Sequence, residues 1–320
     1  MAYTQGQGNF QPGTAGVATS MVELSISARN LLDCDVTSKS DPMCVVFLKP
    51  FGAPLNSDNW NELMRTERIQ NNLNPNFAKK VQINYCFEQQ QHLKFDIYDV
   101  DSHSNKLSDH DFIGSCQTTL GQIVSAGGGA GSQGQGLKLK LSNPGRMPSN
   151  VGELIIQAEE LSDCKDDLEL QFVGKKLDKK DWFGSSDPFL QISRANERPG
   201  DFTLVHRTEH INNNVNPTWK KFIIPLRTLC NGDLERNLKI ECFDYNNSGN
   251  HSFIGEFYVT ASQLMKGPTS ENHHPCINPK KKVSDICYFL SILVICNLIH
   301  YSFTRCNFFL LSNIVGKEEL

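Results

Sequence analysis

The chain of 320 residues contains one internal repeat, and each copy has the size of a domain. The stretch RTERIQNNLNP at 65–75 matches RTEHINNNVNP at 207–217. Other pairs follow in the same order at offsets of 141 to 146 residues: 22–26 with 168–172, 40–42 with 186–188, 95–99 with 240–244, and 112–114 with 253–255. A unit of about 140 residues is too long for a solenoid repeat, so the sequence predicts two similar domains in tandem.

Each copy consists of short segments in which apolar and polar residues alternate, as in VELSISA at 22–28 and FDIYD at 95–99. Turn-forming pairs such as Asn74-Pro75 separate these segments. This pattern is typical of antiparallel sandwiches, and helical periodicity is confined to short turns near 119–124 and 261–266. The predicted fold class is all-β, with two tandem antiparallel eight-stranded β-sandwiches and a divergent hydrophobic C-terminal tail.

The repeat also sets the expected domain boundaries. Residues 1–20 are rich in Gly, Gln and Thr and are expected to form a disordered tail. The first domain is expected at 21–162 and the second at 163–282, followed by the tail at 283–320. The run ICYFLSILVICNLI at 286–299 is short for a membrane-spanning helix, which needs about 20 apolar residues.

The tail bears on the second sandwich because the first copy ends with a closing strand, ELIIQA at 153–158, and the second copy lacks a matching sequence. One hypothesis is that 288–295, rich in strand-forming residues, supplies the missing strand. The alternatives are a short hydrophobic helix that seeks membranes and an aggregation-prone segment from splicing or a gene-model error.

Aspartates gather at the ends of the predicted strands of the first copy. Asp35 and Asp41 flank one loop, while Asp99, Asp101 and Asp111 flank another. Calcium binds six to eight oxygen ligands, and an empty cluster of carboxylates repels itself, so this arrangement predicts a calcium site. The alternative is that each aspartate is a solvated turn former.

An EF-hand loop does not explain these aspartates. Counted from Asp99, such a loop needs Gly at its sixth position and Glu at its twelfth. The chain has Ser104 and His110 at those positions.

The chain contains the motifs Ser-Asp-Pro, Asn-Pro-x-aromatic, Asp-x-Asp and Asp-x-Ile-Gly. In these motifs it resembles the C2 domains of protein kinase C and synaptotagmin. The segments KKLDKKDWFGSSDP at 175–188 and INPKKK at 277–282 make residues 21–282 resemble copines more narrowly. The resemblance implies a cytoplasmic protein that docks on anionic phospholipid, at the plasma membrane, when calcium rises. Copines continue into a von Willebrand A domain, so this chain is expected to be a truncated or alternatively spliced product.

The resemblance also implies a set of calcium ligands in each copy. The five ligands of the first copy are Asp35, Asp41, Asp99, Asp101 and Asp111. Those of the second copy are Asp181, Asp187, Asp244 and Asn246, with Ser252 at the last position. Because two acids are replaced, the second site is expected to bind calcium more weakly.

The second copy carries further candidate membrane contacts. Trp182 and Phe183 follow a ligand position and would insert at the membrane interface, or pack inward on the sandwich end. In the first copy Val36 and Leu107 are weaker counterparts. A set of lysines indicates either a phosphoinositide-binding face or a solvated surface. These lysines are at positions 175, 176, 179, 180, 220, 221 and 280–282.

Composition narrows the remaining function classes. A net charge of −4 argues against a nucleic-acid partner, and eleven scattered cysteines indicate free thiols in a reducing compartment. The GAGSQG match at 129–134 has no flanking strand and helix, so it does not indicate dinucleotide binding. The chain is expected not to be an enzyme and to act in membrane signalling or trafficking with unspecified signalling proteins. A calcium-independent C2 scaffold and a C2-bearing fragment of a lipid enzyme stay as alternatives.

Overall fold

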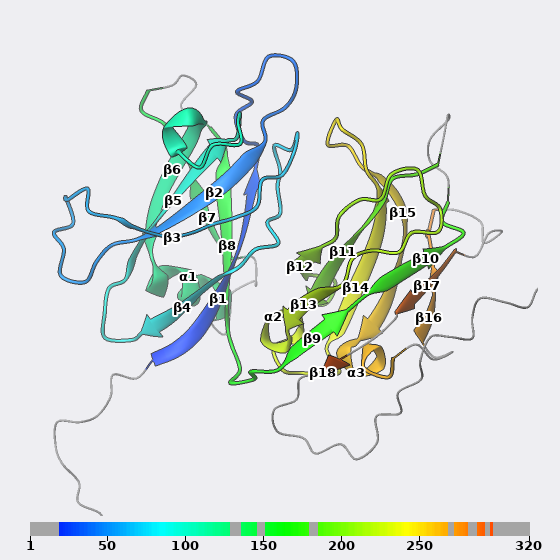
Figure 1. The fold of residues 1–320 in the computed structure, drawn as a ribbon. Helices are drawn as coiled ribbons and strands as arrows, with labels where there is room; N and C mark the ends of the chain where they lie inside the picture. Colours follow the sequence, from blue (N-terminus) through cyan, green and yellow to red (C-terminus); the bar gives the residue numbers. More distant parts are fainter. Residues whose placement is uncertain are drawn as a thin grey trace, which may run out of the picture.

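Two β-sandwiches lie side by side in the computed structural model, one from each copy of the repeat (Figure 1). The structure describes residues 19–128, 136–145, 151–178, 185–267 and 272–280, and the backbone of 287–291 and 295–296. The predicted all-β fold is therefore confirmed: the sheets are antiparallel and the helices are short.

The first sandwich has two four-stranded sheets, with strand orders β4-β1-β8-β7 and β3-β2-β5-β6. Its strands are β1 (Thr19–Arg29), β2 (Pro42–Leu48), β3 (Asn61–Arg65), β4 (Val81–Cys86), β5 (His92–Asp99), β6 (Asp111–Thr119), β7 (Leu137–Lys140) and β8 (Glu153–Glu160). Thr19 and Ser20, which the sequence assigns to the disordered tail, begin β1. The rest of that expected tail lies outside the described residues.

Alternation along β1 shows why the sequence folds this way. Leu24, Ile26 and Ala28 point into the sandwich and are buried, because successive side chains of a strand face opposite sides of the sheet. Glu23 is also fully buried, although it lies on the opposite face. Its face is covered by the second sandwich, whose Arg194 and Thr228 contact its carboxylate.

The second sandwich repeats this plan. One sheet has the order β12-β11-β14-β15, and the other is made of two pieces, β13-β9-β18 and β10-β17-β16. The strands are β9 (Asp167–Leu170), β10 (Phe172–Lys175), β11 (Pro188–Ala195), β12 (Phe202–Arg207), β13 (Phe222–Pro225), β14 (Asn237–Asp244), β15 (Ser252–Thr260), β16 (His273–Cys276), β17 (Cys287–Ser291) and β18 (Ile295–Cys296). Its core is centred on Trp219, whose indole N–H donates to the carbonyl of Pro188 at 3.1 Å.

The C-terminal tail contributes two of these strands. β17 pairs antiparallel with both β10 and β16, and β18 pairs with β9. In the first sandwich the same place, between β1 and β7, is held by β8. The backbone of β17 and β18 therefore occupies the position that the strand hypothesis assigns to the tail, beyond the expected domain limit at residue 282.

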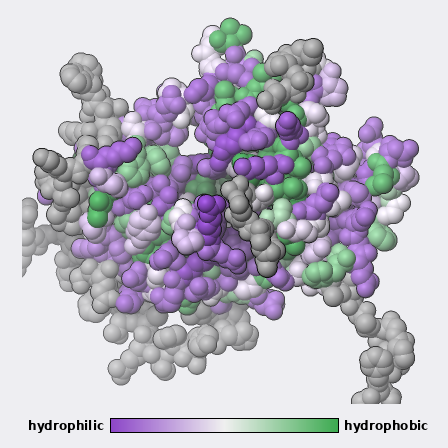
Figure 2. Space-filling view, turned by 180° about the vertical axis from the view of Figure 1, so that it is seen from behind, coloured by the Kyte–Doolittle hydropathy of each residue, from purple (hydrophilic) through white to green (hydrophobic). Residues whose placement is uncertain are grey.

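Helices are minor features of both sandwiches. In the part of the chain that the structure describes, the helical elements are α1 (Leu120–Gly128), α2 (Leu226–Cys230), α3 (Ala261–Leu264) and the 3-10 turn η1 (Leu107–Asp109). α1 and α3 lie where the sequence predicts short helical turns. Among the described residues, no helix has the length and apolarity needed to span a bilayer. On the face opposite to Figure 1, hydrophilic residues predominate and hydrophobic ones form separate patches (Figure 2).

Candidate metal centre

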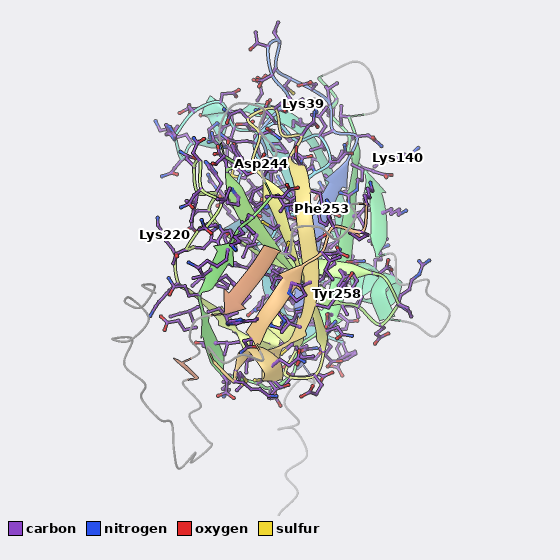
Figure 3. All side chains as sticks on the ribbon, turned by 90° about the vertical axis from the view of Figure 1, so that its right-hand side faces the viewer. Lys39, Lys140, Lys220, Asp244, Phe253 and Tyr258 are labelled. Atoms are coloured by element: carbon purple, nitrogen blue, oxygen red, sulfur yellow. The ribbon has the colours of Figure 1, made fainter. Side chains whose placement is uncertain are left out.

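The described members of the predicted ligand sets lie at strand ends or in the adjoining loops, at one end of each sandwich. In the first sandwich they lie in the β1–β2 loop and where β5 ends and β6 begins, and in the second they lie just before β11 and where β14 ends. Asp244 of the second sandwich and Lys39, from the β1–β2 loop of the first, are found toward the same end of the molecule (Figure 3). The two loop edges therefore face in a common direction.

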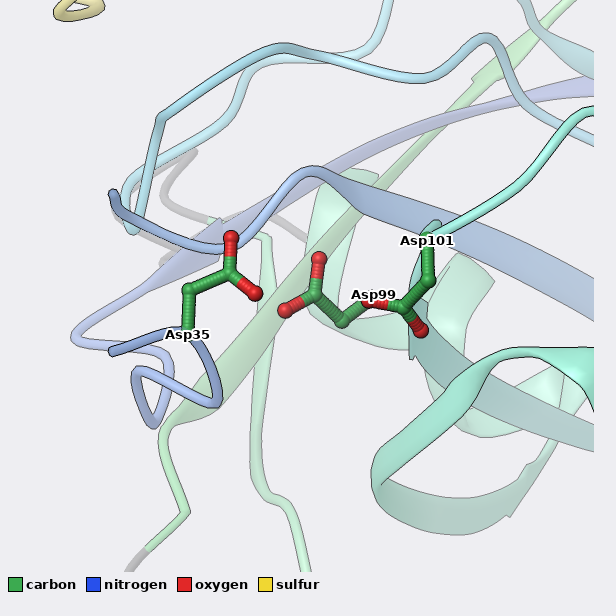
Figure 4. A group of neighbouring side chains, drawn as sticks. All are labelled: Asp35, Asp99 and Asp101. Carbon is green, nitrogen blue, oxygen red and sulfur yellow. The ribbon is translucent and has the colours of Figure 1, made fainter. Parts of the chain in front are cut away.

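Three carboxylates of the first edge form a group that suits a cation. Oxygens of Asp35, Asp99 and Asp101 lie within 4.8 Å of one another. Ligand oxygens surround calcium at about 2.3–2.6 Å, so two ligands on opposite sides are up to about 5 Å apart. Figure 4 shows the Asp35 and Asp99 carboxylates facing each other across the gap between their loops. Within the described parts of the chain, this is the one group of at least three acidic, His or Cys side chains with such spacing.

Asp99 is the buried member of the group, with an exposed fraction of 1%. Its Oδ1 accepts a hydrogen bond from the backbone N–H of Asp41 at 2.6 Å, while its Oδ2 is buried without a hydrogen-bond partner. The pKa of Asp99 is raised, mainly by burial. Hydrogen bonds from the Ser40 side chain and the Asp41 backbone lower it, and the nearby charges of Asp35 and Asp101 raise it. A buried carboxylate oxygen without a donor carries a desolvation penalty that a bound cation would remove.

Asp41 borders the group and is held by its own contacts. Its Oδ1 accepts the backbone N–H of Asn71 at 2.8 Å, and its Oδ2 is 3.7 Å from Nη1 of Arg68. The structure therefore places Asp41 beside the three-carboxylate group, with its orientation set by the segment after β3.

Asp111 also borders the group. It begins β6 opposite Asp99, and its backbone N–H donates to Oδ2 of Asp101 at 3.0 Å. The backbone of Asp111 thus orients one of the three grouped carboxylates.

The second edge reproduces this hydrogen-bonded frame. The N–H of Asp187 donates to Oδ1 of Asp244 at 2.6 Å, and the N–H of Asn213 donates to Oδ1 of Asp187 at 2.7 Å. Asp244 has an exposed fraction of 1%, the same as Asp99. The hydrogen bonds of Asp41 with Asp99 and Asn71 are therefore reproduced in the second edge.

The second edge differs in its charge. Nδ2 of Asn246 donates to the carbonyl of Asn250 at 2.8 Å and lies 3.4 Å from Oγ of Ser252. The amide nitrogen is thus directed to neighbours at the edge, where the first sandwich has carboxylates. Asp181, the remaining predicted ligand, lies outside the described residues.

Several predicted membrane contacts also fall outside the described residues, namely Trp182, Phe183 and the lysines at 179, 180, 281 and 282. Of those described, Val36 next to Asp35 is 100% exposed, whereas Leu107 is partly buried. The described lysines at 175, 176, 220, 221 and 280 are all exposed.

Sequence reasoning missed the residues that hold the ligands. Asn71 and its counterpart Asn213 both belong to the repeated motif that begins Arg-Thr-Glu, and both donate a backbone N–H to a ligand aspartate. Both also have positive φ, 51° and 50°, a conformation that asparagine tolerates well. The repetition of Asn within this motif was a usable signal, but its contact with the aspartates was not visible in the sequence.

Comparison with protein families decides the class of both sandwiches. The C2 domain model matches residues 22–134 and again residues 170–276. The chain belongs to the C2 domain family. Its two C2 domains stand in tandem, and each matched segment covers most of one sandwich.

Solved structures of C2 domains are similar to parts or most of the chain. BON1-C2B shares 28% identity over 42% of this chain and 94% of that chain, with a TM-score of 0.38. The C2A and C2B domains of Extended-Synaptotagmin 2, calcium bound, share 14% identity over 87% of this chain and 97% of that chain, with a TM-score of 0.31. The C2A domain of plant Extended Synaptotagmin 1 shares 19% identity over 45% and 97%, with a TM-score of 0.32. The family assignment rests on the two family-model matches.

Proposed function

We propose that this protein is a calcium-dependent phospholipid-binding protein that docks reversibly on anionic membranes through the loop edge of its first C2 domain. The observation that carries this proposal is the group of Asp35, Asp99 and Asp101, with the buried and unpartnered Oδ2 of Asp99 inside it. Asp41 and Asp111 would complete the ligand set, because both adjoin the group through hydrogen bonds.

The proposed mechanism uses the cation as a bridge. The grouped carboxylates would supply only part of the six to eight oxygens that calcium takes, so coordination positions would stay open for phosphate oxygens of lipid headgroups. Val36 projects fully exposed beside Asp35 and would enter the headgroup region alongside the bridge. The exposed lysines of the second domain would add attraction to an anionic leaflet, about 1 kcal/mol for each lysine near the surface.

The narrower assignments are part of the same proposal. The KKLDKKDWFGSSDP and INPKKK segments favour a copine-type protein, and the lysines around them favour phosphoinositide as an additional ligand. We infer a non-enzymatic protein of the cytoplasm, recruited to the plasma membrane in signalling or trafficking. Its calcium dependence separates it from the alternative of a calcium-independent scaffold.

Cosedimentation with vesicles tests the proposal. Vesicles of phosphatidylserine and phosphatidylcholine are mixed with the full chain in calcium or in chelator, and the bound fraction is measured. The double variant Asp99→Asn with Asp101→Asn removes two charges from the bridge and is expected to abolish calcium-driven binding. The charge-matched control is Asp58→Asn with Asp163→Asn, two exposed aspartates outside the predicted ligand set.

The outcomes separate the candidate functions. Calcium-driven sedimentation of the wild type and of the control, but not of the Asp99 and Asp101 variant, supports the proposal. Equal sedimentation of the variant and the wild type would contradict it. Binding that is the same in calcium and in chelator would favour constitutive electrostatic attraction, and no binding in either condition would favour the scaffold.

A further inference from the structure

We propose that the β14–β15 loop of the second C2 domain positions Asp41 of the first, so that the calcium affinity of the first site depends on the second domain. This inference rests on the proposed function. It concerns residues 245–249, which belong to one domain and lie against the ligand-bearing edge of the other (Figure 1).

Asn71 is the residue through which the two edges meet. Its backbone N–H donates to Oδ1 of Asp41 at 2.8 Å, and its Oδ1 accepts the N–H of Lys39 at 2.9 Å. Its Nδ2 donates to the carbonyl of Asn247, across the domain boundary, at 2.7 Å. Through its backbone and its side chain, Asn71 therefore joins the β1–β2 loop, which carries Asp35 and Asp41, to the loop of the second domain.

A second contact lies next to the first. The hydroxyl of Tyr245 is hydrogen-bonded to Oε1 of Gln70, the residue before Asn71. Tyr245 stands between the candidate ligands Asp244 and Asn246, and its ring stacks on His210 with centroids 4.1 Å apart. The second domain thus holds two consecutive residues of the first at the point where one of them supports Asp41.

The approach at Gly249 is too close for any other residue. Its φ is +75°, and a Cβ built on it would lie 2.1 Å from the carbonyl oxygen of Asn71. A side chain there would have to displace the Asn71 backbone, because the obstructing atom is not a movable side chain. Gly52 offers a matched comparison, since its φ is +76° and nothing lies within 4 Å of its Cβ position.

A buried ion-pair network fixes the domains deeper in the interface. Arg194 of β11, with an exposed fraction of 1%, lies 3.0 Å from Oε1 of Glu23 and 2.9 Å from Oε2 of Glu159. Thr228 of the second domain also donates to Glu23, at 2.9 Å. These contacts exist only in the docked arrangement of the two domains, and within it Oε1 of Glu23 and Nε of Arg194 have no hydrogen-bond partner.

Docking of the two domains would change the calcium affinity of the first site through the orientation of the Asp41 carboxylate. Groups that hold a metal ligand by hydrogen bonds commonly change metal affinity by about 10–100-fold when they are lost. If the segment at 70–71 is displaced, Asp41 loses the donor that fixes its carboxylate, while all carboxylates remain present. The expected result is weaker calcium binding with an unchanged number of acidic ligands.

Calcium titration of the full chain by calorimetry tests the inference. Gly249→Ala is compared with Gly52→Ala and with the wild type. Both variants place alanine at the same positive φ, so both carry similar backbone strain, but only the first meets the Asn71 carbonyl. We expect Gly249→Ala to weaken the first site by about tenfold and Gly52→Ala to leave its affinity unchanged.

A second, milder variant keeps the inference testable if Gly249→Ala does not fold. Tyr245→Phe removes only the hydroxyl that contacts Gln70, and it is expected to weaken calcium binding about two- to threefold, in proportion to one lost hydrogen bond. Equal affinities of Gly249→Ala and Gly52→Ala, with Tyr245→Phe at the wild-type value, would overturn the inference and leave the proposed function intact. A wild type that binds no calcium would instead contradict the proposed function.

Discussion

The loop edges of the two C2 domains share a frame and differ in charge. In each, the residue before the second strand of the repeat donates its N–H to a buried aspartate at 2.6 Å, Asp41 to Asp99 and Asp187 to Asp244. Asp101 of the first edge is matched by Asn246 in the second, whose amide bonds to its own loop. The frame is thus retained where the acidic residues are incomplete, which indicates that it serves the fold of the loops.

The two sandwiches also differ in how they are closed. In the first, β8 pairs with β1 along eight consecutive residues, Val22 to Arg29. In the second, β17 and β18 fill the same place with two shorter pieces, paired to β10 and β9. The closing strand is continuous in one domain and interrupted in the other, so the second domain depends on a segment whose sequence does not repeat the first.

The largest predicted effect is the loss of stability of the second domain when the chain is truncated. Ending the chain at Lys282 removes β17 and β18 and leaves β10 and β16 without their shared partner. Unpaired strands lose their hydrogen bonds and expose the sandwich interior, so we expect the second domain to melt at least about 10 °C lower, as measured by calorimetry. A chain that ends after Cys296 keeps both strands and is the control.

The melting transition of the first domain should change less than that of the second. An unchanged second transition in the Lys282 truncation, with improved solubility, would show that the tail is foreign to the fold.

Restoring the missing acids should make the edges more alike. In a chain whose first site is disabled by Asp99→Asn and Asp101→Asn, we introduce Asn246→Asp and Ser252→Asp into the second. Calcium affinity depends on the number of charged ligands, so we expect the second site to bind at least about tenfold more tightly, by titration calorimetry.

The control adds the same charge to the same loop at other positions, with Ser248→Asp and Asn250→Asp. If both pairs of substitutions strengthened binding equally, general charge rather than the matched ligand positions would explain the effect.

Much of the fold could be predicted because its signals are local. The alternation in 22–28 and 153–158 reports strands directly, and the repeat carries each strand assignment to the other copy. The grouped aspartates could be predicted because Asp35 lies in a loop between two strands and Asp99 and Asp101 lie where β5 ends, and such loops of a sandwich converge. These inferences need only spacing and residue type.

The remaining features depend on contacts between distant segments. Nothing local distinguishes Arg194 as the partner of Glu23, because its position in the repeat corresponds to the apolar Leu48 of the first domain. The pairing of the tail cannot be predicted for a similar reason, because its composition suits a strand and a helix alike. The contact of Asn71 with Asn247 depends on how the domains dock, which no single-domain motif encodes.

His206 provides the smallest test, at a position where the two domains differ in chemistry. Its ring stacks on Phe222 with centroids 3.7 Å apart, and burial lowers its pKa to about 4. The corresponding residue of the first domain is Met64, which packs against the core and does not titrate. Because the folded-state pKa lies below the ordinary value of about 6.5, the unfolded chain binds the proton more readily. Stability from this group is complete above pH 6.5 and is lost as the pH falls toward 4.

Since the ring of His206 is partly exposed, we expect His206→Met to remove about 1 kcal/mol of the stability difference between pH 7 and pH 5, measured by denaturant unfolding. His103→Met, at an exposed position in the first domain, should leave that difference unchanged. An equal pH dependence in wild type and His206→Met would show that the buried imidazole is not the source of the contrast.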